Sequence, residues 1–110
     1  MDNNNEYIDV QDALKRIGGN LDLYKKLLIQ FTSGNHIAPL EEAFDAGALQ
    51  EASGLLHTLK GVAANLSLIK LAESARKVEE DVKNNLNHTD AFAELKDIYH
   101  ITSQEISKVL

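Results

Sequence analysis

Apolar residues recur every three or four positions along most of the chain, and short polar or glycine-containing breaks divide them into six runs. This period is typical of amphipathic helices, and no stretch shows the strict alternation of a half-buried strand. The pattern therefore predicts an all-α fold. The expected core positions of the six runs are Val10, Ala13, Leu14 and Ile17; Leu21, Tyr24, Leu28 and Phe31; Ile37, Leu40 and Phe44; Leu49, Ala52, Leu56, Leu59, Ala63 and Leu66; Leu68, Leu71, Ala72, Ala75, Val78 and Val82; and Phe92, Leu95, Ile98, Thr102, Ile106 and Val109.

The breaks between these runs indicate where helices begin and end. Gly18 and Gly19 end the first run, and Asn20 is placed to cap the second helix. Ser67 is placed to cap the fifth helix, and residues 84–89 are expected to form a loop. Several amphipathic helices with short connections favour an antiparallel four-helix bundle with additional short N-terminal helices. The four longer helices toward the C-terminus are expected to form the bundle.

Composition narrows the class of protein. The chain has 110 residues, which suits one domain, and we expect a flexible tail over residues 1–7 before a helical domain over 8–110. The net charge of −6 argues against nucleic-acid and anionic-membrane partners. The lack of cysteine excludes a disulfide framework and a thiolate zinc site. No apolar run is long enough for a membrane span, and the N-terminal stretch "MDNNNEY" is polar and acidic, without the apolar region of a signal peptide. We therefore expect a cytoplasmic monomer, and the starting methionine favours a free-standing protein.

The fourth helix, expected over about residues 48–66, holds two glycines on its exposed face. At about 100° per residue, Gly54 and Gly61 lie opposite the apolar seam, with His57 between them. Glycine inside a helix costs roughly 1 kcal/mol relative to alanine, so this bare surface needs a reason. Lys60 is the one long neighbour of His57 on this helix. The neighbouring positions Gln50, Ser53, Gly54 and Ala64 are expected to form a docking surface.

An exposed imidazole with small neighbours suits chemistry performed together with a second protein. Its ring nitrogen is a nucleophile near neutral pH, and the small neighbours let a partner bring a phosphoryl group close. The ammonium of Lys60 can compensate the new phosphate charge. The sequence around His57 thus predicts a phosphoacceptor, although an exposed histidine without any chemistry remains the alternative.

The stretch "HTLKGVAANL", residues 57–66, resembles the phosphoacceptor motif of histidine-containing phosphotransfer (HPt) domains, H-x-L-K-G-x-A-x-x-L. The upstream stretch over 12–31 and the downstream stretch "LAESARKVEE" over 71–80 are similar to the corresponding parts of that family. The resemblance implies a helical bundle that accepts a phosphoryl group from an aspartyl phosphate of a receiver domain and passes it to another receiver. It implies no ATP site, no cofactor and no enzyme activity of its own. The implied partners are receiver domains or a hybrid sensor histidine kinase.

The resemblance also implies roles for single residues. His57 would be the phosphoacceptor and Lys60 the phosphate-stabilising cation. Gly61 would leave space beside the ring for the docking partner. Glu79 would accept a hydrogen bond that orients the imidazole. Two positions depart from the family pattern, because Ala64 and Ser67 stand where many members have glycine. Both are small, so docking is expected to persist with an altered partner preference.

Other functions fit the sequence less well than phosphotransfer does. A non-catalytic scaffold for receiver or kinase domains is the main alternative, but a scaffold need not keep the His-Lys-Gly set. The dimerising domain of a sensor kinase would need an acidic residue after the histidine and a proline five residues after it, where Thr58 and Val62 stand. No second histidine lies one turn from His57, so no metal site is expected. The remaining candidates are expected to be solvated or capping histidines and a solvated acidic run: His36, His88 and His100, and the run "EED" at 79–81.

Overall fold

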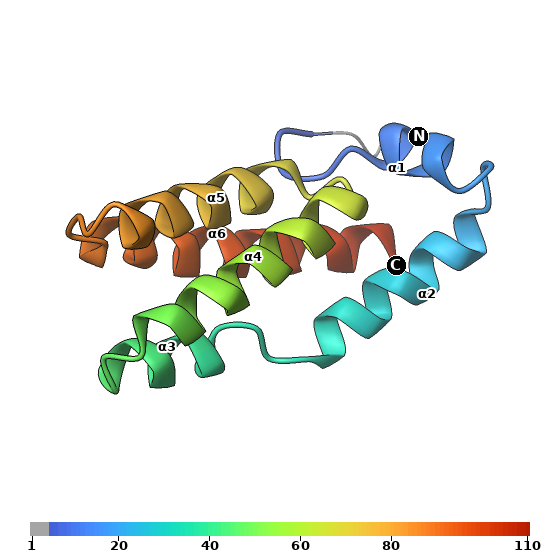
Figure 1. Ribbon diagram of the computed structural model, residues 1–110. Coiled ribbons are helices and arrows are strands. Elements are labelled where there is room, and N and C mark those ends of the chain that lie inside the picture. The colour runs from blue at the N-terminus through green and yellow to red at the C-terminus, as the bar shows by residue number, and fades with distance from the viewer. Residues whose placement is uncertain (1–4) are drawn as a thin grey trace.

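Helices account for nearly all regular structure in the part of the chain that the computed structural model describes, residues 5–110, and no strand occurs there (Figure 1). The helices are α1 Val10–Arg16, α2 Leu21–Ser33, α3 Ala38–Asp45, α4 Leu49–Asn65, α5 Ile69–Lys83 and α6 Thr89–Val109. The all-α prediction is confirmed. None of these helices is long and apolar enough to cross a membrane.

The helices form an antiparallel four-helix bundle, as the sequence predicts (Figure 1). Helix α5 packs against both α4 and α6, while α3 contacts α4 and α2 contacts α6. One arm of the bundle is therefore divided between α2 and α3, which follow one another in the same direction (Figure 1). Helix α2 has 13 residues and α3 has 8, so the expectation that the last four helices are the longer ones is wrong for α3.

The core consists of the apolar stripes that the helical period predicts, with two exceptions at helix ends. Tyr24, Leu28 and Phe31 of α2 are buried, but Leu21 is 41% exposed. Leu49 of α4 is likewise 40% exposed, although the rest of its seam is buried. Both exceptions are the first residue of their helix, at the end of the packed seam. The helical period therefore predicts the face that is buried but not how far along the helix the burial extends.

The two predicted caps have opposite outcomes. The side chain of Asn20 accepts a hydrogen bond from the backbone N–H of Leu23 at 3.0 Å, which confirms it as the cap of α2. Ser67 does not cap α5, whose N-cap residue is Leu68 and has no side-chain capping bond. Instead Ser67 has φ of 55° and its N–H donates to Ala64, so it closes α4 in the left-handed conformation. That conformation favours glycine, which accounts for the residue that many HPt domains carry at this position.

The tail predicted over residues 1–7 remains a prediction, because residues 1–4 lie outside the described part of the chain. Among the described residues, the carbonyl of Tyr7 accepts a hydrogen bond of 3.0 Å from the N–H of Ile69. The carbonyl of Ser67 accepts one of 3.0 Å from the N–H of Asp9. The segment that leads into α1 is thus attached to the connection between α4 and α5.

Side chains from α1 and α2 bind the C-terminal end of α4. The last carbonyls of a helix have no partner within it and need one elsewhere. The guanidinium of Arg16 donates to the carbonyl of Ala64, and the hydroxyl of Tyr24 donates to the carbonyl of Leu66 at 2.7 Å. Burial, with the charge of Asp9 as a second cause, raises the pKa of Tyr24, so its hydroxyl stays protonated and can donate. The side chains of α1 and α2 therefore fix the end of the helix that carries His57.

We expect Tyr24→Phe to lower the free energy of unfolding by about 1–2 kcal/mol, because the buried carbonyl of Leu66 loses its hydrogen-bond donor. The ring itself stays, so helix content should be unchanged. Urea denaturation followed by circular dichroism measures the change. A variant as stable as the original chain would show that this hydrogen bond contributes nothing to the attachment of α2 to α4.

Candidate functional site

His57 projects from the exposed face of α4, near the middle of the helix. The buried face of α4 consists of Ala52, Leu56, Leu59 and Ala63, each at most 3% exposed. The side chain of His57 is 70% exposed, which confirms that it is not a core residue. Packing of the apolar seam against the neighbouring helices therefore directs the imidazole to solvent.

The two glycines beside His57 are not required by packing within the molecule. A Cβ atom added at Gly54 or at Gly61 would meet no heavy atom within 4 Å. Neither glycine has a positive φ. Gln50 and Ala64 are exposed on the same helix, and Ser53 is half-buried. The fold thus tolerates side chains at both glycine positions, and their absence leaves free space beside the ring.

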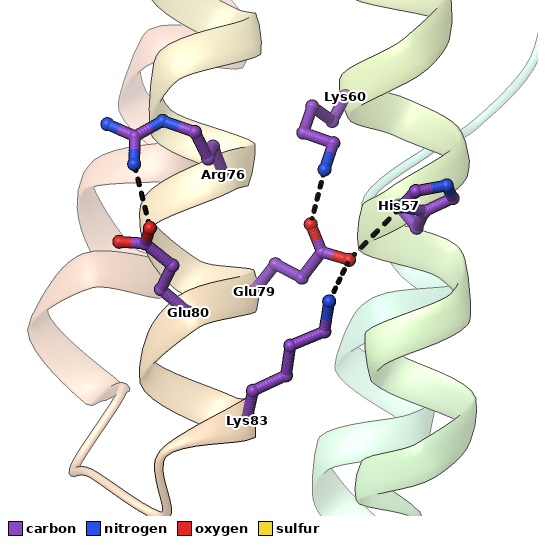
Figure 2. A network of polar contacts seen from close by, with 6 residues as sticks. All are labelled: His57, Lys60, Arg76, Glu79, Glu80 and Lys83. Atoms are coloured by element: carbon purple, nitrogen blue, oxygen red, sulfur yellow. Dashed lines mark hydrogen bonds and ion pairs between the residues drawn. The ribbon is translucent and has the colours of Figure 1, made fainter.

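A buried carboxylate from the neighbouring helix holds the imidazole (Figure 2). Glu79 of α5 has a side chain only 4% exposed, and its Oε2 lies 3.2 Å from Nδ1 of His57. Its other oxygen, Oε1, accepts a hydrogen bond of 2.8 Å from Nζ of Lys60. Nζ of Lys83 lies 3.3 Å from Oε2. One carboxylate therefore connects His57 with two ammonium groups.

The charges around Glu79 determine which imidazole nitrogen is free. Burial alone would raise the pKa of Glu79, but hydrogen bonds and attraction from Lys60 and Lys83 outweigh it and hold the pKa below its ordinary value. The carboxylate is therefore ionised at neutral pH and can only accept hydrogen bonds. Nδ1 of His57 must then carry the proton of the neutral ring, and Nε2 keeps its lone pair. The lone pair that can act as a nucleophile belongs to the nitrogen that Glu79 does not bind.

The acidic run at 79–81 differs from the prediction of a solvated face. Glu79 and Asp81 are 3% and 5% exposed, and only Glu80 of the three is exposed. Glu79 is buried because it faces α4, and Asp81 pairs with Lys77 at 2.8 Å. Sequence reasoning missed Lys83 as a partner of Glu79, although the spacing of four residues on one helix is a signal for such a pair.

The two departures from the family motif lie in different surroundings. Ala64 is exposed on the face of His57, where a partner can contact it. Ser67 is 3% exposed and its hydroxyl donates to Asp12 at 2.7 Å, so it is not part of that surface. A change in partner preference remains a prediction for both positions, and only Ala64 of the two lies where a partner can contact it directly.

The other histidines have no lysine and glycine beside them. His36 is only half-exposed, stacks on Phe31 and has Nε2 3.1 Å from that residue's carbonyl oxygen, so it is not simply solvated. His88 precedes α6 without a side-chain capping bond and stacks on Phe44. His100 is exposed. Within residues 5–110, no group of three or more potential metal ligands gathers in one place.

We expect Glu79→Gln to lower stability by about 1 kcal/mol at pH 7, because the two ammonium groups lose their charged acceptor. Since folding lowers the pKa of Glu79, its contribution is complete above the ordinary value of 4.5 and is lost as the pH falls through the folded value. The stability difference between the two proteins should therefore shrink on acidification. Urea denaturation at several pH values measures it.

Glu80→Gln is the matched control for this experiment. Glu80 is the next residue of α5. It forms an ion pair with Arg76 in which both side chains are exposed. Exposed pairs contribute little, so this variant should change stability by less than about 0.5 kcal/mol at any pH. A difference for Glu79→Gln that grows on acidification would contradict the assignment of a lowered pKa to Glu79.

Comparison with known proteins assigns the chain to a family. The family model described as "Hpt domain" matches residues 28–105, which is more than half of the chain. The chain therefore belongs to the Hpt domain family. The match begins inside α2 and ends inside α6, so it includes all of α3, α4 and α5. Searches of curated proteins and of solved structures gave no match.

Membership of the family defines the class of function. Hpt domains are phosphocarrier modules of two-component signalling rather than catalytic enzymes, and they interact with receiver domains and kinases. Phosphotransfer in two-component signalling is therefore the class of function to which this chain belongs.

Proposed function

We propose that the chain carries a phosphoryl group on Nε2 of His57, which it accepts from the aspartyl phosphate of one receiver domain and passes to another. The observation that carries the proposal is the hydrogen bond of Nδ1 to buried Glu79, because it leaves Nε2 free on a side chain that is 70% exposed. Nζ of Lys60 binds the other oxygen of the same carboxylate at 2.8 Å.

The transfer needs no group beyond the two proteins. The lone pair of Nε2 attacks phosphorus, the N–P bond forms as the P–O bond to the donor aspartate breaks, and the aspartate leaves as a carboxylate. Nδ1 keeps its proton, so the phosphorylated ring becomes cationic and the negative charge of Glu79 stabilises it. Passing the phosphoryl group to a second aspartate reverses these steps. Positioning and electrostatics dominate phosphoryl transfer, and His57, Lys60 and Glu79 supply both.

The docking surface in this proposal is the exposed face of α4 on either side of His57. Ser53, Gly54 and Gly61 lie about one turn from His57 and have short side chains or none, and Gln50 and Ala64 lie about two turns from it. A receiver must bring its aspartate within bonding distance of Nε2, and a smooth surface around the ring permits that approach.

A transfer experiment tests the proposal. A receiver domain is phosphorylated with a labelled small-molecule phosphodonor, purified and mixed with the chain. We expect label to move to the chain and to be acid-labile and base-stable, as for a phosphoramidate. ATP alone should give no label. A receiver that binds the chain and transfers no label would favour the scaffold alternative.

A further inference from the structure

Lys83 contacts the same carboxylate oxygen as the imidazole, from a different side (Figure 2). Its Nζ lies 3.3 Å from Oε2 of Glu79, and Nδ1 of His57 lies 3.2 Å from that atom. Lys60 binds the other oxygen, Oε1, at 2.8 Å. With one carboxylate and two ammonium groups, the site has a net charge of +1 before any phosphate arrives.

Lys60 has two tasks that compete. In the resting molecule its ammonium neutralises Glu79, whereas during transfer the phosphoryl group on Nε2 needs the same ammonium. A carboxylate only 4% exposed cannot lose its last cation without a large penalty. Until the N–P bond forms the imidazole is neutral, so Lys60 can turn toward the incoming phosphoryl group only if another cation remains on Glu79.

We propose that Lys83 is the positioning residue that keeps Glu79 paired while Lys60 moves to the phosphoryl group. This inference rests on the proposed function of His57. Lys83 is suited to the role because it lies one turn from Glu79 on α5 and contacts Oε2, so Lys60 can leave Oε1 without disturbing it. Its side chain is 60% exposed, compared with 31% for Lys60, so its ammonium reaches Glu79 from the solvent side.

The test measures the rate of transfer from a phosphorylated receiver as a function of receiver concentration. We expect Lys83→Met to lower the maximal rate about three- to tenfold and to leave the half-saturating receiver concentration unchanged. Lys83→Arg should restore most of the rate because it restores the cation. Lys60→Ala should lower the maximal rate at least about tenfold, since the phosphoryl charge then has no ammonium.

A Glu79→Gln background distinguishes positioning from direct action. If Lys83 works only by keeping Glu79 paired, Lys83→Met should have no effect on the transfer rate of a Glu79→Gln chain, where no buried charge needs a cation. A loss in that background as large as the loss in the original chain would overturn the inference, because Lys83 would then act on the phosphate or the receiver itself.

Lys77→Met is the matched control. Lys77 is 61% exposed and pairs with nearly buried Asp81 four residues later on the same helix, but it does not contact Glu79. It should leave the rate unchanged. The inference also fails if Lys83→Met transfers at the original rate or changes only the half-saturating concentration. If instead the original chain accepts no label, or a chain without His57 accepts it, the proposed function itself fails.

Discussion

Replacing His57 with glutamine is expected to abolish labelling by a phosphorylated receiver. The amide of glutamine has no ring nitrogen with a nucleophilic lone pair, so no N–P bond can form. The fold should persist, because the side chain is 70% exposed and glutamine can still donate a hydrogen bond to Glu79. The free energies of unfolding of the variant and the original chain, obtained from thermal melts, should therefore agree within about 0.5 kcal/mol. Transfer assays on receivers that label the original chain measure the loss.

The remaining histidines provide the controls. His100 is exposed on α6 and has no lysine and glycine beside it, so His100→Gln should be labelled like the original chain. His88→Gln should behave in the same way. Label that persists in His57→Gln and disappears in either control would assign the phosphoacceptor to another residue.

The face on which His57 lies could be predicted from the sequence because it depends on one local period. Ala52, Leu56 and Leu59 recur at helical spacing and are all buried, so the opposite side of α4 had to be exposed. The motif around His57 then indicated the family, and the match over residues 28–105 bears this out.

Burial of the carboxylates on α5 could not be predicted in the same way. Glu79 and Asp81 are polar residues next to exposed Glu80, and nothing in their own spacing marks them as buried. Their burial depends on how α5 packs against its neighbours, which is a contact between distant parts of the chain. The hydrogen bond from Lys60 to Glu79 spans 19 residues and has the same origin.

The error at Ser67 has a different cause. Serine before an apolar run is the usual sign of an N-cap, but here the preceding helix ends first. The N–H of Leu68 bonds to the carbonyl of Ala63 at 2.8 Å, which places Ser67 in the left-handed position that ends α4. Two helices joined so closely compete for the same residue, and a residue pattern does not show which of them takes it.

Replacing Gly61 with glutamine is expected to slow phosphoryl transfer at least about tenfold while the fold is retained. Gly61 lies one turn after His57 on the exposed face, where a longer side chain would stand between the ring and an approaching receiver. The glycine is not needed for packing, since an added Cβ meets no heavy atom within 4 Å. Glutamine favours the helix over glycine, so the variant should be more stable by roughly 0.5–1 kcal/mol.

Gly61→Ala separates the effect on docking from the effect on the helix. Alanine gives at least as large a gain in stability as glutamine, because both remove the entropic cost of glycine, but it adds only one methyl group beside the ring. We expect its transfer rate to lie between those of the original chain and Gly61→Gln. Rapid-quench transfer paired with urea denaturation measures both quantities on the same proteins. If both Gly61→Gln and Gly61→Ala transfer at the original rate, a receiver does not approach across this surface. The presence of a helix-destabilising glycine at this position would then need another explanation.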